Sequence, residues 1–177
     1  MNYPDAVVVA VSLGAAVTDV ARGKVYNALT FSAIALGLLA GLFLRQMSFW
    51  QSTTGLVGGY LVYLVPHKLG AMGKGDVKLM AAVGAWKGLP FVLFASFYIL
   101  CIGSVLGLLV LAWRGTLFSS LQWVLATVVG SVVPWVKQPR NAAPQTPMPF
   151  APAIFAGIAY AVYLEAVQGP FTFSSWI

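Results

Sequence analysis

The 177-residue chain is 60% hydrophobic and only 8% charged, and its formal net charge is +6. Soluble domains usually carry about 25% charged residues, so the composition excludes a soluble globular enzyme. The abundance of apolar and aromatic residues also excludes a disordered chain. The single cysteine, Cys101, excludes a disulfide framework and a thiolate metal cluster. A polytopic membrane protein is therefore predicted.

Six apolar segments are predicted to be transmembrane helices, because about 20 apolar residues span the hydrocarbon core of a bilayer. They are Ala6–Val20, Ala28–Leu44, Gly55–Pro66 (extendable back to Ser52), Val77–Trp86, Leu89–Trp113 and Phe150–Val167. The predicted fold class is all-α, a six-transmembrane-helix bundle that forms one membrane-embedded domain over residues 1–177.

A further apolar run, Thr116–Val136, is basic at both ends, with Arg114 before it and Lys137 and Arg140 after it. Basic residues mark the cytoplasmic ends of membrane segments. The pattern therefore favours an interfacial or re-entrant helix inside a cytoplasmic loop over residues 115–148, with a true span as the alternative.

Basic residues also predict the orientation of the bundle. If the first span ends in the cytoplasm, eight of the ten basic residues are cytoplasmic and only Arg45 and Lys87 lie outside. Both termini are then external, and the positive charge indicates contact with anionic lipid and not with nucleic acid. Residues Met1–Pro4 contain no basic side chain, so a cleaved signal peptide is not expected.

The four acidic residues of the chain are Asp5, Asp19, Asp76 and Glu165. Asp5 precedes the first apolar run and is predicted to cap it, and Glu165, near the end of the last span, is predicted to snorkel outward. Asp19 and Asp76 lie at the inner ends of two different spans, so they are expected at the same membrane depth. An ionisable residue in a membrane segment suggests function and needs a partner, and each of these two is the obvious partner of the other.

Two carboxylates held a few ångströms apart share a proton, as in aspartic proteases. One carboxylate takes a proton from water while the other, protonated, polarises the scissile carbonyl. The structural alternative is a pair of salt bridges, from Asp19 to Arg22 and from Asp76 to Lys74 or Lys78. The two lysines also fit a simpler role as cytoplasmic anchors.

Glycines beside Asp76 favour the protease. Gly73 and Gly75 flank Lys74 immediately before the aspartate, and bare backbone there would let an extended substrate approach closely. In a membrane, such irregular backbone is buried in protein or lines a water-filled cavity.

Other classes of function are weighed against this one. A serine protease is disfavoured because the only histidine, His67, lies at a span end beside Lys68. Two membrane aspartates also suit a small ion or solute carrier, and a catalytically silent assembly or scaffold protein could keep them structurally. Because acids are few and no histidine or cysteine cluster exists, no metal and no other cofactor is expected.

Three strings carry a family resemblance. AMGKGDVKLMAAVGAWKG closely resembles the second catalytic motif of the type IV prepilin peptidases, which are GxGD membrane aspartic proteases. TDVARGKVYN resembles the first motif of that family, and MPFAPAIFAG resembles the Pro-Phe-Gly-Pro segment that opens its last span. The resemblance implies an aspartic endopeptidase with Asp19 and Asp76 as its catalytic pair.

The resemblance also implies roles for residues around that pair, and it shows two departures. Tyr26 stands where the first motif usually has proline, and Ala151 stands where the third usually has glycine, which adds a methyl group near the substrate. The implied GxGD loop and site lining consist of Gly73, Lys74, Gly75, Pro149, Phe150 and Pro152.

The implied substrates are prepilins or pseudopilins, whose basic leader is removed at the cytoplasmic face of the cell membrane. Larger members carry an N-terminal cysteine-bearing domain and methylate the product; here the first span starts within ten residues of Met1, so that domain and activity are expected to be absent. The expected subgroup is the minimal, peptidase-only one of Tad/Flp-type pili, with archaeal preflagellin peptidases as the alternative. Because leader and inner face are both basic, capture through the substrate's apolar helix is expected.

Overall fold

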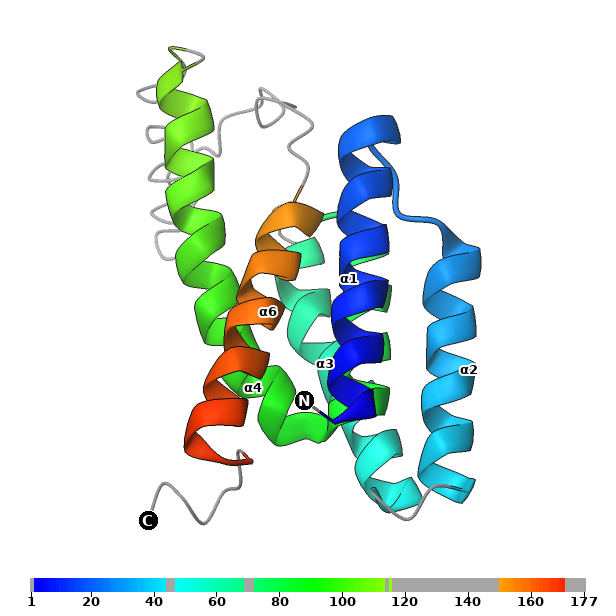
Figure 1. The fold of residues 1–177 in the computed structure, drawn as a ribbon. Coiled ribbons are helices and arrows are strands. Elements are labelled where there is room, and N and C mark those ends of the chain that lie inside the picture. The colour runs from blue at the N-terminus through cyan, green and yellow to red at the C-terminus, as the bar shows by residue number, and fades with distance from the viewer. Residues whose placement is uncertain (1, 44–46, 69–71, 114, 116–149, 171–177) are drawn as a thin grey trace, which may run out of the picture. The chain divides into compact units, whose positions relative to one another are not determined.

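A computed structural model describes residues 2–43, 47–68, 72–113, 115 and 150–170. These residues form the helices α1 (Tyr3–Arg22), α2 (Asn27–Phe43), α3 (Phe49–Lys68), α4 (Lys74–Trp113) and α6 (Ala151–Gln168) (Figure 1). The chain divides into two compact units, Met1–Gly103 with Pro149–Ile177, and Ser104–Met148. The site lies in the first unit. The predicted helix at Thr116–Val136 and nearly all of the loop at 115–148 lie outside the described residues.

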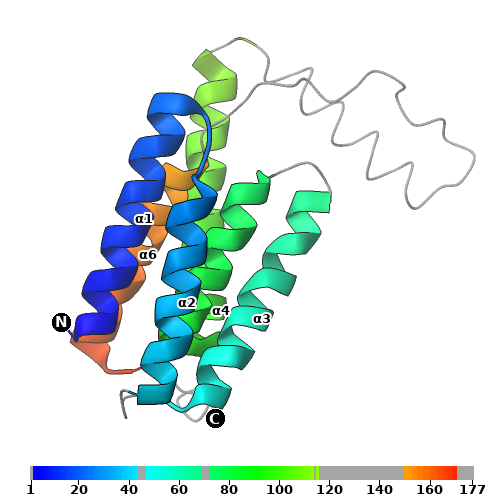
Figure 2. The same ribbon diagram turned by 90° about the vertical axis from the view of Figure 1, so that its right-hand side faces the viewer.

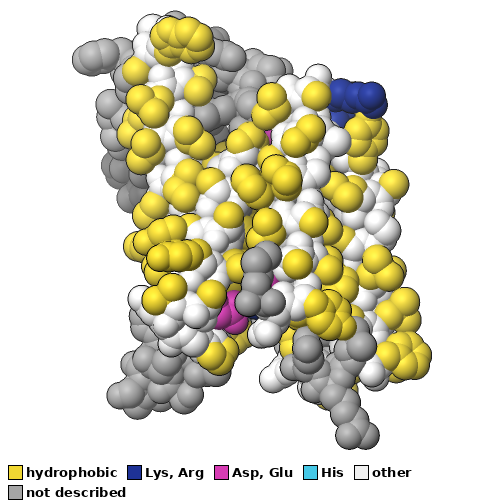
Figure 3. All heavy atoms as spheres, in the orientation of Figure 1, with side chains coloured by type: hydrophobic (Ala, Val, Ile, Leu, Met, Phe, Trp, Pro, Cys, Tyr) yellow, Lys and Arg dark blue, Asp and Glu magenta, His cyan; other side chains and the backbone are white. Residues whose placement is uncertain are grey.

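The all-α prediction is confirmed, and the chain is a membrane protein. By length and composition, α1, α4 and α6 can cross a membrane, and α2 is a shorter apolar helix. Large apolar side chains such as Leu13, Val17 and Leu39 are about half exposed, and hydrophobic side chains cover much of the face in Figure 3. Continuous exposed apolar surface of this kind suits lipid and not water.

The predicted count of six helices is not confirmed, because the fourth and fifth predicted segments are contiguous in α4. Gly88 has non-helical backbone angles there, φ 80° and ψ 172°. Glycine adopts a positive φ without steric cost, and Pro90, two residues later, lacks the N–H that a continuous helix would use. The two segments are therefore separated by a kink in α4 and not by a loop.

The first part of α4 forms the centre of the core. Every residue in Asp76–Trp86 is buried except Lys78, which is partly buried. A Cβ atom on Gly55 of α3 would lie only 2.1 Å from the carbonyl oxygen of Gly84, so the two helix backbones touch. This close packing holds the start of α4, and Asp76 with it, in place.

Helices α1 and α6 pack side by side along this core, and α2 packs against α1 and α3 (Figures 1 and 2). A Cβ on Gly157 of α6 would lie 2.4 Å from the Ile99 side chain of α4, which shows how closely α6 approaches that helix. The C-terminal end of α1 therefore lies beside the N-terminal end of α6.

Candidate active site

The ends of five helices meet at one end of the first unit. These are the C-terminal ends of α1 and α3 and the N-terminal ends of α2, α4 and α6 (Figures 1 and 2). A helix N-terminus carries unpaired N–H groups and a partial positive charge, both of which favour an anion. Three such termini make this end suited to carboxylates.

Asp76 lies in the first turn of α4 and is 5% exposed. The backbone N–H of Gly73 donates to its Oδ2 at 3.1 Å, and the helix dipole favours its negative charge. Just before this glycine, the carbonyl of Met72 accepts a hydrogen bond from His67 Nδ1 at 2.9 Å. His67, which was predicted only to lie at a span end, therefore also fixes the chain that leads into the GxGD loop.

Asp19 lies in the last turn of α1 and is partly exposed. Its carbonyl oxygen accepts the N–H of Gly23 at 2.7 Å, which closes the helix with a left-handed residue (φ 63°). The negative end of the α1 dipole is unfavourable for a carboxylate. The backbone N–H of Ala151, the first residue of α6, compensates by donating to Asp19 Oδ2 at 3.1 Å.

The structure brings the two predicted carboxylates together, since Asp19 is close enough to Asp76 for their charges to interact. Each carboxylate has its Oδ2 on a backbone N–H. Both ion pairs found among the described residues belong to Lys87, so neither Asp19 nor Asp76 forms a salt bridge with a described residue. His67 is also near enough for its charge to act on Asp76. Two neighbouring acids without a salt-bridge partner suit the sharing of one proton.

The predicted salt-bridge alternative is wrong for the described residues, because neither aspartate forms an ion pair there and two of the three basic side chains have other partners. The Arg22 guanidinium donates to the hydroxyl of Tyr26, the residue that replaces proline in the first motif. Lys78 Nζ donates to Asn27 Oδ1 at 2.8 Å, and Lys74 is exposed with no described partner.

The two glycines of the GxGD loop have different neighbours. A Cβ on Gly75 would lie 2.7 Å from the Cβ of Val25, so the connection between α1 and α2 already occupies that space. A Cβ on Gly73 would lie 3.3 Å from Asp76 Oδ2, and the next nearest atom would be 4.0 Å away. Gly73 is exposed, so of the two glycines only Gly73 keeps the open backbone expected for a substrate.

The third motif contributes a main-chain group, which sequence reasoning missed. The Ala151 side chain is fully buried, so its methyl group packs in the core and its N–H faces Asp19. The Phe150 ring packs on α4, where a Cβ on Gly103 would lie 2.6 Å from it. Pro152 follows in the first turn of α6. The first N–H groups of any helix have no partner inside the helix, so the start of this predicted span was a signal that a backbone donor would be available there. Pro149 lies outside the described residues.

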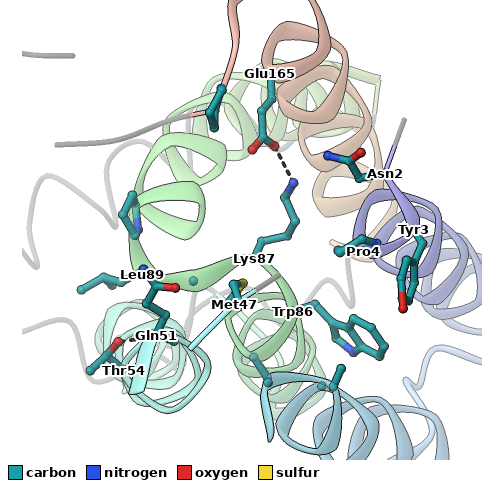
Figure 4. Close-up of a pocket in the computed structure, with 17 residues that line it drawn as sticks. Asn2, Tyr3, Pro4, Met47, Gln51, Thr54, Trp86, Lys87, Leu89 and Glu165 are labelled. Atoms are coloured by element: carbon teal, nitrogen blue, oxygen red, sulfur yellow. Dashed lines mark hydrogen bonds and ion pairs between the residues drawn. The ribbon is translucent and has the colours of Figure 1, made fainter. Parts of the chain in front are cut away.

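The other two acids, Asp5 and Glu165, meet at Lys87 of α4, at the opposite end of this unit. Lys87 lies about 16 Å from Asp76 along α4, at a rise of about 1.5 Å per residue. Lys87 Nζ lies 2.5 Å from Asp5 Oδ1 and 2.6 Å from Glu165 Oε2, and Figure 4 shows Lys87 reaching toward Glu165. The prediction that Glu165 snorkels outward is wrong, because its side chain is only 19% exposed and compensates a buried lysine.

The prediction that Asp5 is the N-cap of the first helix is also wrong. Asn2 is the N-cap, and its backbone N–H donates to Asp5 Oδ2 at 2.8 Å. Asp5 therefore sits inside the first turn, where it completes a capping box and also binds Lys87.

A cavity of about 600 Å³ lies at this same end, beside the kink of α4. Trp86, Lys87 and Gln51 are among the side chains that line it (Figure 4), and neither Asp19 nor Asp76 does. The cavity and the aspartate pair are therefore separate features.

Comparisons with known proteins agree with this geometry. No curated protein and no solved structure matches the chain. Residues 6–112 match the type IV leader peptidase family. This range is more than half of the chain and includes both aspartates and the GxGD loop, whereas α6 lies beyond it. The chain therefore belongs to the type IV leader peptidase family and is an aspartic-type prepilin peptidase.

Proposed function

We propose that Asp19 and Asp76 are the catalytic pair of this membrane endopeptidase, and that it removes the basic leader of prepilins or pseudopilins at the cytoplasmic face of the cell membrane. One observation carries the proposal: two interacting carboxylates from α1 and α4 lie at one end of the bundle, and neither forms a salt bridge with a described residue. Family membership supports the cleavage of a prepilin leader.

The hydrogen bonds to the two acids support a division of labour within each carboxylate. Because Oδ2 of Asp19 and Oδ2 of Asp76 each accept a backbone N–H, both Oδ1 atoms remain for the reaction. One aspartate, ionised, takes a proton from water as the water oxygen attacks the scissile carbonyl carbon. The other, protonated, donates a hydrogen bond to the carbonyl oxygen, and the C–N bond then breaks as the leaving nitrogen gains a proton. The shared proton belongs to the pair and not to either residue.

The charge distribution supports the cytoplasmic orientation. Basic side chains gather in and beside the helix ends that hold the two aspartates, as the positive-inside rule requires of a cytoplasmic face. They also attract anionic lipid headgroups. These residues are Arg22, Lys24, Lys68, Lys74 and Lys78.

Capture of the substrate is proposed to occur through its apolar N-terminal helix. The leader is basic, so this basic end does not attract it over long distances. The exposed apolar surfaces of α1 and α2, which include Val20 and Phe31 near the aspartate end, suit a substrate helix that diffuses in the bilayer. Cleavage rates that do not depend on the hydrophobicity of the substrate helix would contradict this mode of capture.

The test is coexpression with candidate prepilins, followed by the mobility shift that accompanies leader removal. Wild type should cleave, whereas Asp19→Asn and Asp76→Asn should not. Asp5→Asn is the matched control, because it removes an acid far from the pair. The mass of the mature product distinguishes cleavage alone, which we propose, from cleavage with N-methylation. Cleavage that survives in either aspartate variant would contradict the pair, and gradient-dependent ion flux without cleavage would favour a carrier.

A further inference from the structure

Lys78 makes a contact that the catalytic chemistry does not use. It lies two residues after Asp76 and is partly buried, and its Nζ lies 2.8 Å from Asn27 Oδ1 and 4.9 Å from the centre of the Phe31 ring. Asn27 is the first residue of α2. The contact therefore joins two helices across 51 positions of sequence, which neither a membrane anchor nor a partner for Asp76 would require.

The connection between α1 and α2 is held against α4 at two points. This connection is residues 23–26, because α1 ends at Arg22 and α2 begins at Asn27. Inside it, Val25 packs where a Cβ on Gly75 would lie. At its end, Asn27 binds Lys78. The two contact points on α4, Gly75 and Lys78, flank Asp76.

These contacts restrict the position of Asp19 because the connection between α1 and α2 is short. Asp19 lies one turn before Gly23, and the Gly23 N–H is bonded to its carbonyl oxygen. Four residues span at most about 14 Å when fully extended. Fixing the connection on both sides of Asp76 therefore limits where the end of α1, and with it the carboxylate of Asp19, can stand relative to Asp76.

We propose that Lys78 is a positioning residue for the aspartate pair: its hydrogen bond to Asn27 sets the position of Asp19 relative to Asp76. Lys78 touches neither of the two carboxylates, and its role rests on the proposed function of that pair. Lys68 supplies the matched control. It carries the same charge, is the last residue of α3 at the same end of the unit, and is exposed with no partner among the described residues.

The kinetic test compares Lys78→Met, Lys78→Arg and Lys68→Met with wild type, using purified enzyme in lipid vesicles and a prepilin substrate. Misplacing reacting groups by about 1 Å can cost about 100-fold in rate, and a partial shift here should lower kcat about tenfold in Lys78→Met with KM nearly unchanged. Lys78→Arg should restore kcat, since a guanidinium N–H reaches the same oxygen, and Lys68→Met should behave as wild type.

A double-mutant cycle identifies the contact itself. Asn27→Leu should lower kcat as much as Lys78→Met does, and the double variant should lose no more than either. Losses that multiply would overturn the proposal. So would equal losses in Lys68→Met and Lys78→Met, which would indicate a general effect of surface charge, or a change in KM alone, which would indicate leader binding.

A readout independent of catalysis separates this inference from the proposed function. With Cys101→Ser as the background, Asp19→Cys and Asp76→Cys together can be joined by a short bifunctional thiol reagent. Adding Lys78→Met should reduce the crosslinked fraction several-fold, and adding Lys68→Met should not. Equal crosslinking in both would overturn the positioning role. A drop in crosslinking would uphold it even if Asp19→Asn were to retain cleavage and the proposed catalytic pair were to fail.

Discussion

At each end of the buried part of α4, an acidic residue accepts a backbone N–H in the same local geometry, but the two acidic residues have different partners. Asp5 and Asp76 each occupy the third position of a helix and accept the N–H of the residue three positions earlier, at 2.8 and 3.1 Å. Around Asp5 the tertiary structure supplies Lys87. Around Asp76 it supplies a second carboxylate, Asp19.

Capping alone therefore does not mark an acidic residue as structural or catalytic. At the Lys87 end, two acids compensate one buried cation, which favours a fixed structure. At the Asp19 end, two acids interact, and we propose that they share one proton and use it in catalysis. The deciding quantity is the charge of the neighbour, and that neighbour comes from another helix.

The contrast between the two ends is tested most directly by the same substitution of aspartate with asparagine at both ends. Asp76→Asn should lower kcat about 10²–10⁴-fold, the range of acid–base catalysis, with little loss of folded protein. Asp5→Asn, at the equivalent helix position, should leave kcat near wild type, because Glu165 still compensates Lys87. Cleavage rates measured at equal amounts of folded enzyme check this, and equal losses in both variants would contradict it.

The second prediction concerns the Lys87 end and should affect stability and not chemistry. Lys87→Met leaves Asp5 and Glu165 buried without a cation, and breaking a buried ion pair in this way costs about 3–5 kcal/mol. Thermal unfolding in detergent measures the loss. Adding Asp5→Asn and Glu165→Gln should recover most of it, and a triple variant as unstable as Lys87→Met would show that the lysine acts in another way.

The third prediction separates the two glycines of the GxGD loop. Gly75→Ala should destabilise the protein by about 1–3 kcal/mol, since the new methyl group overlaps Val25. Val25→Gly in the same protein removes the Cβ that the new methyl group overlaps, and it should restore stability and cleavage. If the double variant folds well but remains inactive, Gly75 serves the substrate and not the packing of residues 23–26.

The smallest expected effect tests the amide that α6 directs at Asp19. Ala151→Pro removes this N–H at the first position of α6. It should lower kcat about tenfold, the value of roughly one hydrogen bond of about 1.4 kcal/mol. Ala151→Gly keeps the N–H and is the control. Equal activity of the two variants would show that the amide does not position Asp19.

Much of the fold could be predicted from local patterns along the chain. Apolar runs located the helices, and the break between the fourth and fifth segments fell at Gly88, although the chain there kinks and does not leave the core. The two aspartates and the GxGD string were visible because acids are scarce in this sequence. Hydropathy and helix capping are local free energies, so a sequence reveals them directly.

The partners of the charged groups were decided only by the tertiary structure. Lys87 binds acids from α1 and α6, Lys78 binds Asn27 of α2, and Asp19 accepts the N–H of Ala151 across 132 positions. Each of these contacts depends on which helix ends the packing brings together. A backbone N–H also has no side-chain signature, because every residue except proline carries one. The sequence alone determined which groups can do chemistry, and packing decided which of them meet.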